Sequence, residues 1–286
     1  MKAKTIFAAS AAVTGAYLVA SAPRVFHRPD MKGLLTNYAH RGLHGDGIPE
    51  NSLKAFKRAI DVGVGIELDV RESADGTLYI FHDNDLKRMC GVDKKFKETH
   101  DSEIDLLRLN GSDEHIPLFT EVLALVDGKV PLLIELKADM GDKTLCPKVA
   151  SVLDEYKGLF CVESFNSFLM GWFKKNRPKI PRGQLYTDLK DPQPKLRAFA
   201  DSMMINSISR PDFIAYDIEH EDKPLLRLCL KLFKPARFVW TVKSEEDFKK
   251  YSNDKKTDGI IFEGICPVKN EERSDPEKDM KGTSQN

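Results

Sequence analysis

The sequence predicts an α/β fold, a TIM (β/α)8 barrel with a small insertion after the third strand and a hydrophobic segment before the barrel. Extended apolar runs alternate with amphipathic stretches beyond residue 35, which is typical of a parallel sheet wound with helices. The chain has 286 residues, 41% of them hydrophobic, so it can bury one large core. Polar residues follow several of the apolar runs, at the rim where a barrel gathers its site. We therefore expect one barrel domain over residues 36–266.

Ten apolar runs are candidate strands, about two more than the barrel needs. We expect Met203-Asn206 and Phe213-Asp217 to compete for one position, and one other run to be a loop segment. The helix after the first strand is the best defined, because Asn51 or Ser52 can cap it and Gly63 follows its end. The candidate strands are Tyr38-His40, Gly65-Val70, Leu78-His82, Leu132-Leu136, Phe160-Glu163, Gln184-Tyr186, Met203-Asn206, Phe213-Asp217, Phe238-Val242 and Gly259-Phe262.

Two segments do not fit the regular alternation. Residues 83–131 are mostly polar and too long for an ordinary connection, which predicts a small inserted subdomain over the barrel mouth. Residues 267–286 are charged and nearly free of apolar side chains, which predicts a disordered polar tail.

The N-terminal residues 1–28 have the charge outline of a membrane anchor or an export signal. Lys2 and Lys4 precede a charge-free stretch that runs from Thr5 to Pro23. This apolar core is short for a spanning helix, and the proline after Ala20-Ser21-Ala22 hinders signal cleavage. We therefore expect an uncleaved anchor and membrane association, with a cleaved signal and a buried or surface helix as alternatives. The chain would then be membrane-anchored or exported.

Charge and cysteine content exclude several classes. Lysine plus arginine and aspartate plus glutamate number 44 each, so no net field favours a nucleic-acid partner. The five cysteines are scattered and never form a Cys-x-x-Cys pair, which argues against a disulfide framework and a structural zinc site. Any phosphate chemistry must depend on charges placed locally.

Three acidic residues are candidate metal ligands. Glu67 and Asp69 are two residues apart on a predicted strand, so both side chains point to the same face and can hold one ion. Glu135 stands on another strand-like run, with Lys137 on the same face to offset charge. Carboxylate ligands favour Mg²⁺ or Ca²⁺ over zinc.

Two histidines are candidates for acid/base chemistry. His40 and His82 each follow an apolar, strand-like run, whereas His100 lies in a polar stretch with no strand before it. If the three strands are parallel, both imidazoles face the cavity that holds the acids. Phosphodiester hydrolysis needs charge neutralisation, a deprotonated nucleophile and a protonated leaving group, which a divalent cation and two imidazoles can supply.

An ordered set of motifs resembles the glycerophosphodiester phosphodiesterase family between about residues 38 and 264. The motifs are His40-Arg41-Gly42, Pro49-Glu50-Asn51-Ser52, Glu67-Leu68-Asp69, Asp75-Gly76, His82-Asp83, Glu135-Leu136-Lys137, Ser164-Phe165-Asn166 and Trp240-Thr241-Val242. The resemblance implies a TIM barrel with an insertion after the third strand. It further implies metal ligands at Glu67, Asp69 and Glu135, an acid/base pair at His40 and His82, phosphate contacts at Arg41 and Lys137, support from Glu50 and Asn51, and Trp240 lining the pocket for the alcohol.

One motif departs from the family. Where the family usually has Asp-Gly-Ile-Ile-Thr-Asp, this chain ends its motif with Phe262-Glu263. The change affects the last rim loop and leaves every candidate catalytic residue in place.

The sequence supports one mechanism and leaves alternatives open. The cation and Arg41 would hold the phosphate oxygens, His40 would take a proton from the nucleophile and His82 would protonate the leaving alkoxide, or the two histidines would exchange roles. The alternative substrate is a lysolipid phosphodiester, which would be cleaved in a lysophospholipase D reaction. A non-catalytic, membrane-tethered phosphodiester binder is a third reading, although a binder needs no pair of proton carriers.

Overall fold

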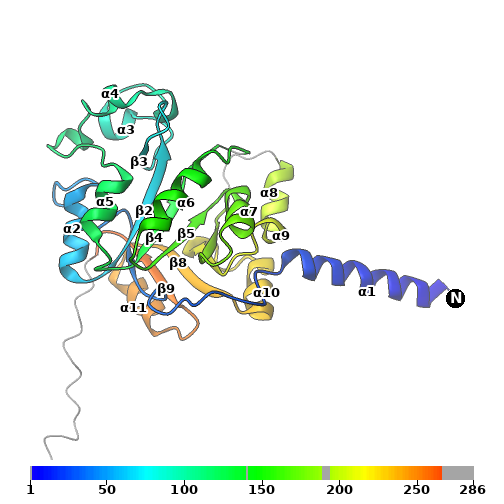
Figure 1. Cartoon of the computed structure of the whole chain (residues 1–286). Coiled ribbons are helices and arrows are strands. Elements are labelled where there is room, and N and C mark those ends of the chain that lie inside the picture. Colours follow the sequence, from blue (N-terminus) through cyan, green and yellow to red (C-terminus); the bar gives the residue numbers. More distant parts are fainter. Residues whose placement is uncertain (1, 140, 189–193, 266–286) are drawn as a thin grey trace, which may run out of the picture.

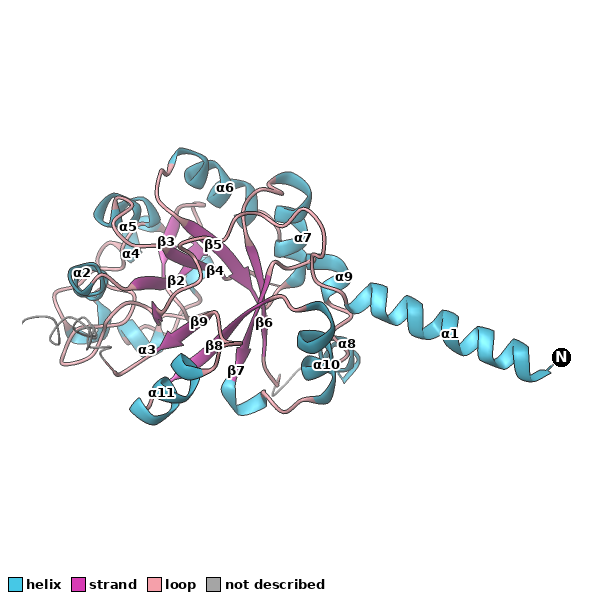
Figure 2. Cartoon of the chain, turned by 90° about the horizontal axis from the view of Figure 1, so that it is seen from below, coloured by secondary structure: helices cyan, strands magenta, loops and turns pink. Residues whose placement is uncertain are grey.

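A computed structural model gives the structure of residues 2–139, 141–188 and 194–265, and it contains a closed barrel of eight parallel strands (Figure 2). Neighbouring strands follow the order β1-β9-β8-β7-β6-β5-β4-β2, and pairing of β1 with β2 closes the ring. The TIM barrel predicted from the sequence is therefore confirmed. The barrel strands are β1 (Tyr38–Ala39), β2 (Gly65–Glu72), β4 (Leu132–Leu136), β5 (Phe160–Ser164), β6 (Arg182–Tyr186), β7 (Phe213–Asp217), β8 (Ala236–Val242) and β9 (Gly259–Phe262).

Helices surround the barrel and cover the outer face of its strands (Figures 1 and 2). In the first of the barrel helices, α2, the Ser52 hydroxyl accepts the Ala55 N–H at 3.2 Å, and Gly63 ends the helix at φ 75°, so the predicted caps are confirmed. The α-helices are α1 (Lys2–Ser21), α2 (Leu53–Val62), α3 (Lys87–Cys90), α4 (Asp101–Ile104), α5 (Phe119–Val126), α6 (Leu145–Glu155), α7 (Ser167–Asn176), α8 (Pro194–Asp201), α9 (Asn206–Ser209), α10 (Pro224–Phe233) and α11 (Glu245–Asn253).

Alternation along the strands divides the core into two layers. On β2, Ile66 and Leu68 face the helices, so Glu67 and Asp69 face the barrel interior. On β4, Leu133 belongs to the interior cluster, which places Glu135, two residues on, on the same side. Because side chains alternate along a strand, the acids point into the barrel, next to the interior hydrophobic cluster that includes Leu133.

The third predicted strand forms, but it does not belong to the parallel barrel as expected. β3 (Leu78–Ile80) runs antiparallel to β2 and forms a hairpin with it, so the insertion follows the second barrel strand. The reversal occurs at a tight turn in which Ser73 N–H donates to the Thr77 carbonyl and Gly76 has φ 85°. The segment after β3 packs on its own small core, which includes Phe81, Phe96 and Leu109. Its helices α3 and α4 lie together beyond β3 (Figure 1).

The expected competition between Met203-Asn206 and Phe213-Asp217 for one strand position is decided in favour of the second run. Met203 to Ile205 form a turn, and Asn206 begins α9, so only Phe213–Asp217 is a strand here. Met203 is fully buried beside the outer core, which explains why an apolar run lies outside the sheet. The segment is apolar because it is buried, and a short buried apolar run cannot be told from a strand by composition alone.

The N-terminal helix α1 projects from the side of the barrel (Figure 1). Within the described part of the chain, no helix is both long and apolar enough to cross a bilayer. The tail predicted over residues 267–286 lies outside the described residues.

Candidate functional site

Three carboxylates meet inside the barrel. Glu67 and Asp69 come from β2 and Glu135 from the neighbouring β4, whose register pairs Asp69 with Glu135. Their exposed fractions are 2%, 1% and 7%. One carboxylate oxygen from each lies within 4.8 Å of the others. The structure therefore brings the three predicted metal ligands into one buried cluster.

Two cations lie against this cluster. Lys137 Nζ is 2.8 Å from Glu135 Oε1 and 3.2 Å from Asp69 Oδ1. Arg41 Nε is 3.5 Å from Asp69 Oδ2. Three carboxyl groups thus face two fixed positive charges, which leaves the fully ionised cluster with one net negative charge.

The turn after β1 aims polar groups at the acids. Arg41 N–H donates to Glu67 Oε2 at 2.9 Å, and Asn51 Nδ2 donates to Asp69 Oδ2 at 2.8 Å. Arg41 and Asn51 both have φ 54°, the left-handed region that side chains rarely adopt. Gly42 completes the turn at φ 80°, where a Cβ atom would lie 2.9 Å from the backbone of α2. The local strain is the cost of this arrangement.

The three acids differ in the pKa values that their surroundings give them. Burial, with Asp69 nearby, raises the pKa of Glu67 well above its usual value, and burial raises the pKa of Glu135 to about 7. Burial also raises the pKa of Asp69, but Lys137, His82 and Arg41 lower it below its usual value. Protons therefore occupy part of the cluster near pH 7. A hard divalent cation with oxygen ligands suits this donor set and would replace them.

His40 lies at the edge of the cluster and is held by an acid from the last strand. Its Nδ1 is 2.8 Å from Glu263 Oε2, and its Nε2 is 4.0 Å from Glu67 Oε2. The hydrogen bond with His40 lowers the pKa of Glu263 to about 2, so this carboxylate is ionised and accepts the Nδ1 proton. Burial lowers the pKa of His40, so the imidazole is neutral at pH 7 with Nε2 free to take a proton.

His82 follows β3 and has its own acidic partner. Its Nδ1 is 2.7 Å from Asp83 Oδ1, and the Arg71 guanidinium donates two hydrogen bonds to its backbone carbonyl at 2.9 and 2.7 Å. Burial lowers the pKa of His82 to about 4, although Asp69 opposes this shift. The antiparallel hairpin therefore delivers His82 to the site that a parallel strand was expected to reach.

A network of charges joins the histidine to the turn after β1. Arg88, from the segment after β3, donates to Asp83 Oδ2 at 2.6 Å and to both Glu50 oxygens at 2.6 and 2.9 Å. Glu50 Oε1 also accepts from Arg41 Nη1 at 2.8 Å. Sequence reasoning included Glu50 but missed Arg88, because nothing local indicates which acids the inserted segment meets.

Trp240 on β8 is linked to the cluster through Phe165. Its ring meets Phe165 edge to face, with centroids 5.6 Å apart. Lys137 Nζ lies 5.9 Å from the Phe165 centroid, so this aromatic pair extends outward from the cation that binds the acids.

A fourth acid was missed as a site neighbour. Glu163 on β5 pairs with Glu135 in the register and is 1% exposed. Burial, with Glu135 and Glu67 nearby, raises the pKa of Glu163 well above its usual value, which disfavours a further negative charge beside the cluster. The sequence placed Glu163 in a strand but gave no sign that it faces inward.

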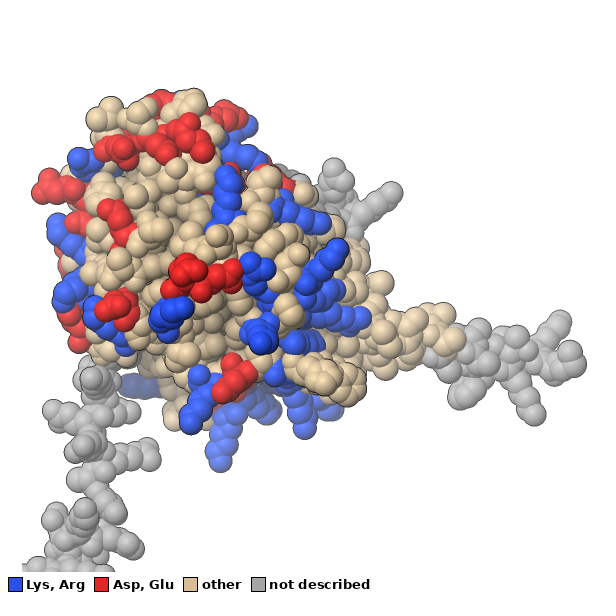
Figure 3. Space-filling model, viewed as in Figure 1, with Lys and Arg blue, Asp and Glu red and all other residues tan. Residues whose placement is uncertain are grey.

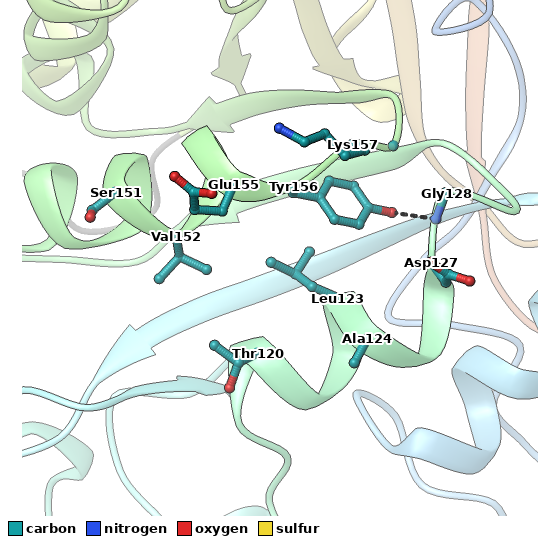
Figure 4. A pocket seen from close by; sticks show the side chains of 11 residues that line it. Thr120, Leu123, Ala124, Asp127, Gly128, Ser151, Val152, Glu155, Tyr156 and Lys157 are labelled. Carbon is teal, nitrogen blue, oxygen red and sulfur yellow. Dashed lines mark hydrogen bonds between the residues drawn. The ribbon is translucent and has the colours of Figure 1, made fainter.

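The pocket drawn in Figure 4 is separate from this site. It lies between α5 and α6, has a volume of about 840 Å³ and includes Leu123, Val152 and Tyr156 in its lining. The Tyr156 hydroxyl accepts the Gly128 N–H at 3.1 Å across it. None of the predicted site residues lines this pocket.

The chain matches a known family over most of its length. The model of the glycerophosphoryl diester phosphodiesterase family matches residues 40–265. A glycerophosphodiester phosphodiesterase of Caldanaerobacter subterraneus subsp. tengcongensis is 33% identical over 162 residues, or 52% of this chain. The lysophospholipase D GDPD1 of Rattus norvegicus is 29% identical over 162 residues, or 50% of this chain. The matched part spans 65% of the first relative and 50% of the second.

Solved structures share the fold. A glycerophosphodiester phosphodiesterase from Thermotoga maritima matches with a TM-score of 0.61 and 26% identity, covering 80% of this chain and 93% of its own. An Oleispira antarctica phosphodiesterase, solved in complex with the product sn-glycerol-3-phosphate, matches with a TM-score of 0.65 and 23% identity, covering 79% and 92%.

Proposed function

Because the chain belongs to the glycerophosphoryl diester phosphodiesterase family, we propose that it hydrolyses glycerophosphodiesters to glycerol 3-phosphate and an alcohol. The observation that carries the proposal is the buried cluster of Glu67, Asp69 and Glu135, flanked by two oriented histidines. A divalent cation, Mg²⁺ or Ca²⁺, would bind the three carboxylates and neutralise the phosphate. The product bound to the Oleispira antarctica phosphodiesterase has the chemistry that this reaction releases.

The protein's own residues have distinct roles in the proposed reaction. Arg41 and Lys137 bind the non-bridging phosphate oxygens, because both are fixed cations beside the acids. His40 accepts the proton of the nucleophile at Nε2, since Glu263 holds its other nitrogen. His82, once protonated, donates that proton to the departing alkoxide oxygen. Because burial holds the pKa of His82 at about 4 without substrate, the imidazolium form depends on the negative phosphate beside the ring and on the Asp83 carboxylate at Nδ1. The nucleophile is water or a glycerol hydroxyl that first forms a cyclic phosphate.

The departure at the last strand is consistent with this mechanism. Glu263 keeps a carboxylate at the position where the family usually has aspartate, and that carboxylate contacts His40. Phe262 is 1% exposed in the outer core and packs edge to face on Phe248. The unusual Phe262 therefore alters packing, while Glu263 supports the proposed base.

The test is metal-dependent product release. The full chain is stripped with a chelator, dialysed and assayed for free glycerol 3-phosphate from glycerophosphocholine and glycerophosphoethanolamine, with Mg²⁺ or Ca²⁺ restored separately. We expect release only with a restored cation, and release from His82→Ala that is slower by about 10²–10⁴-fold. Metal binding without turnover on either diester would contradict the proposal and favour a lysolipid substrate, or the non-catalytic binder if lysolipids are not cleaved either.

A lysolipid is the second candidate substrate. The resemblance to the lysophospholipase D of Rattus norvegicus favours it, as does the proposed membrane association of the N-terminal segment. Release of choline from lysophosphatidylcholine, at a higher rate than from glycerophosphocholine, would favour this reaction over the first.

A further inference from the structure

The outer face of α10 carries leucines that the barrel does not use. Leu226, Cys229 and Leu230 point inward and are buried. Leu225, Leu228 and Leu232 recur at helical spacing on the side next to this buried one and are 37%, 39% and 49% exposed. A helix that needs only one apolar side for its barrel therefore presents a second apolar stripe to the surroundings.

Basic side chains flank this stripe. Arg227, Lys231 and Lys234 are exposed, and α10 itself contains no acid. Among the described residues, none of these three cations takes part in an ion pair. In Figure 3, blue side chains gather on the face beside the base of α1, over the region that α10 occupies in Figure 1. The chain as a whole is neutral, so this excess is local.

Acids also occur beside α10, but they are fewer than the cations. The groove beside α10 is lined by six basic and four acidic side chains, the acids being Glu221, Asp222, Asp254 and Asp258. Glu221 accepts from Lys250 and Tyr251. The cations of α10 remain in excess.

The segment after α1 continues this surface. Arg28 donates to the carbonyls of Phe233 and Lys234 at the end of α10, both at 3.1 Å. This contact ties the segment that contains Val25 and Phe26, which are 46% and 79% exposed, to the C-terminal end of α10.

The base of α1 is joined to the same region. Asn206 Nδ2 donates to the Ser21 carbonyl at 2.8 Å, and Arg210 donates to the carbonyls of Val19 and Ala22 at 2.7 Å. Cys229 of α10 also donates to the Ser21 carbonyl at 3.7 Å, so residues 19–28 are attached to both ends of this part of the barrel surface.

We propose that this surface docks on a bilayer that contains anionic phospholipids. We call it the α10 face; it consists of Leu225, Leu228, Leu232, Arg227, Lys231 and Lys234 on α10 together with Val25 and Phe26. Leucine and phenylalanine bury in the interfacial layer while lysine and arginine contact the phosphates, as in amphipathic helices that lie on membranes. The inference is independent of the catalytic proposal and locates lipid contact on the folded barrel in addition to α1.

Vesicle binding by the full chain tests the α10 face. Co-sedimentation is measured with phosphatidylcholine vesicles and with vesicles that also contain about 30% phosphatidylserine, at low and high salt. We expect binding to the anionic vesicles, weakened by salt. The pair Leu228→Glu and Leu232→Glu, and separately the pair Arg227→Ala and Lys231→Ala, should each need about tenfold more anionic lipid for half-binding.

The control is Leu106→Glu, which changes an 80% exposed leucine in the segment after β3. It should bind as the unchanged protein does. Circular dichroism and glycerol 3-phosphate release in detergent-free buffer verify that the variants fold, because the α10 face lies outside the proposed site. If the α10 variants fold and bind vesicles like the control, the inference is wrong and α1 alone contacts lipid. If the protein is a dimer by light scattering and Leu228→Glu makes it monomeric, the face is a protein interface and the inference is also wrong.

Discussion

Replacing Glu263 with alanine tests whether this acid positions the proposed base. Glu263 Oε2 lies 2.8 Å from His40 Nδ1, while the side chains of His40 and Glu263 are 16% and 25% exposed. The carboxylate therefore fixes both the ring orientation and the tautomer that leaves Nε2 bare. The nearby Lys243, with its Nζ 3.6 Å from the same oxygen, cannot accept the Nδ1 proton.

The size of the effect follows from the type of hydrogen bond. A hydrogen bond to a charged group contributes about 1.5–3 kcal/mol, and partial exposure of Glu263 places this one near about 2 kcal/mol. The loss acts on the transition state, in which His40 becomes positively charged, so kcat should fall about 30-fold. KM should change little, because Glu263 does not lie against the acids that would hold the phosphate through the cation.

The pH profile distinguishes positioning from simple damage. Glu263 raises the pKa of His40 through its hydrogen bond and its charge, against the lowering by burial. In Glu263→Ala the acidic limb of kcat/KM should therefore move to lower pH. Glycerol 3-phosphate release is measured between about pH 4 and 9 with saturating cation.

Two variants complete the experiment. Glu263→Asp keeps a carboxylate and should recover most of kcat, and Glu246→Ala, which removes an exposed acid of α11, should behave like the unchanged enzyme. A kcat within about threefold of the unchanged enzyme in Glu263→Ala, or a loss confined to KM, would refute the positioning role.

Three further predictions concern the same site. His82→Ala should lose about 10²–10⁴-fold in kcat, yet calorimetry should show nearly unchanged binding of Mg²⁺ or Ca²⁺. Asp69→Ala should lose both turnover and cation binding. Weakened cation binding in His82→Ala would contradict the separate roles of the two residues. In chelated protein, His82 should cost stability as pH falls from about 6.5 to 4, because its pKa is lowered to about 4 and the unfolded chain takes the proton first. The difference in unfolding free energy between the unchanged protein and His82→Ala, measured by urea titration, should change over that interval and be flat above it. Arg88→Ala should lower kcat about tenfold by freeing Asp83 and Glu50, and an unchanged kcat would show that their network is not needed.

Local periodicity was enough to find the acids but not to orient every strand. Glu67, Asp69 and Glu135 were predictable because a period of two puts them on one face, and parallel neighbours carry that face into the barrel. The apolar run before His82 would have the same composition whether it formed a parallel or an antiparallel strand. Its antiparallel course depends on the turn at Gly76, which follows Asp75 in the sequence and has φ 85°.

Long-range partners were harder to predict, for a reason that the barrel itself explains. Arg88 reaches Asp83 and Glu50 only after the segment behind β3 has packed on its own core, so its partners depend on tertiary structure. The same holds for Glu163, whose inward direction follows from its pairing with Glu135.

The partner of His40 is different, because barrel closure alone determines it. A closed eight-stranded barrel must pair its first and last strands, and here Ala39 pairs with Phe262. The next residue on each strand is then His40 and Glu263, which must lie side by side at the rim, and the His40 N–H donates to the Phe262 carbonyl at 2.9 Å. The departure from the family motif was visible in the sequence as an unexplained change. Because the barrel closes between β1 and β9, the changed residue Glu263 contacts the proposed base His40. Replacing Glu263 therefore tests the fold and the mechanism together.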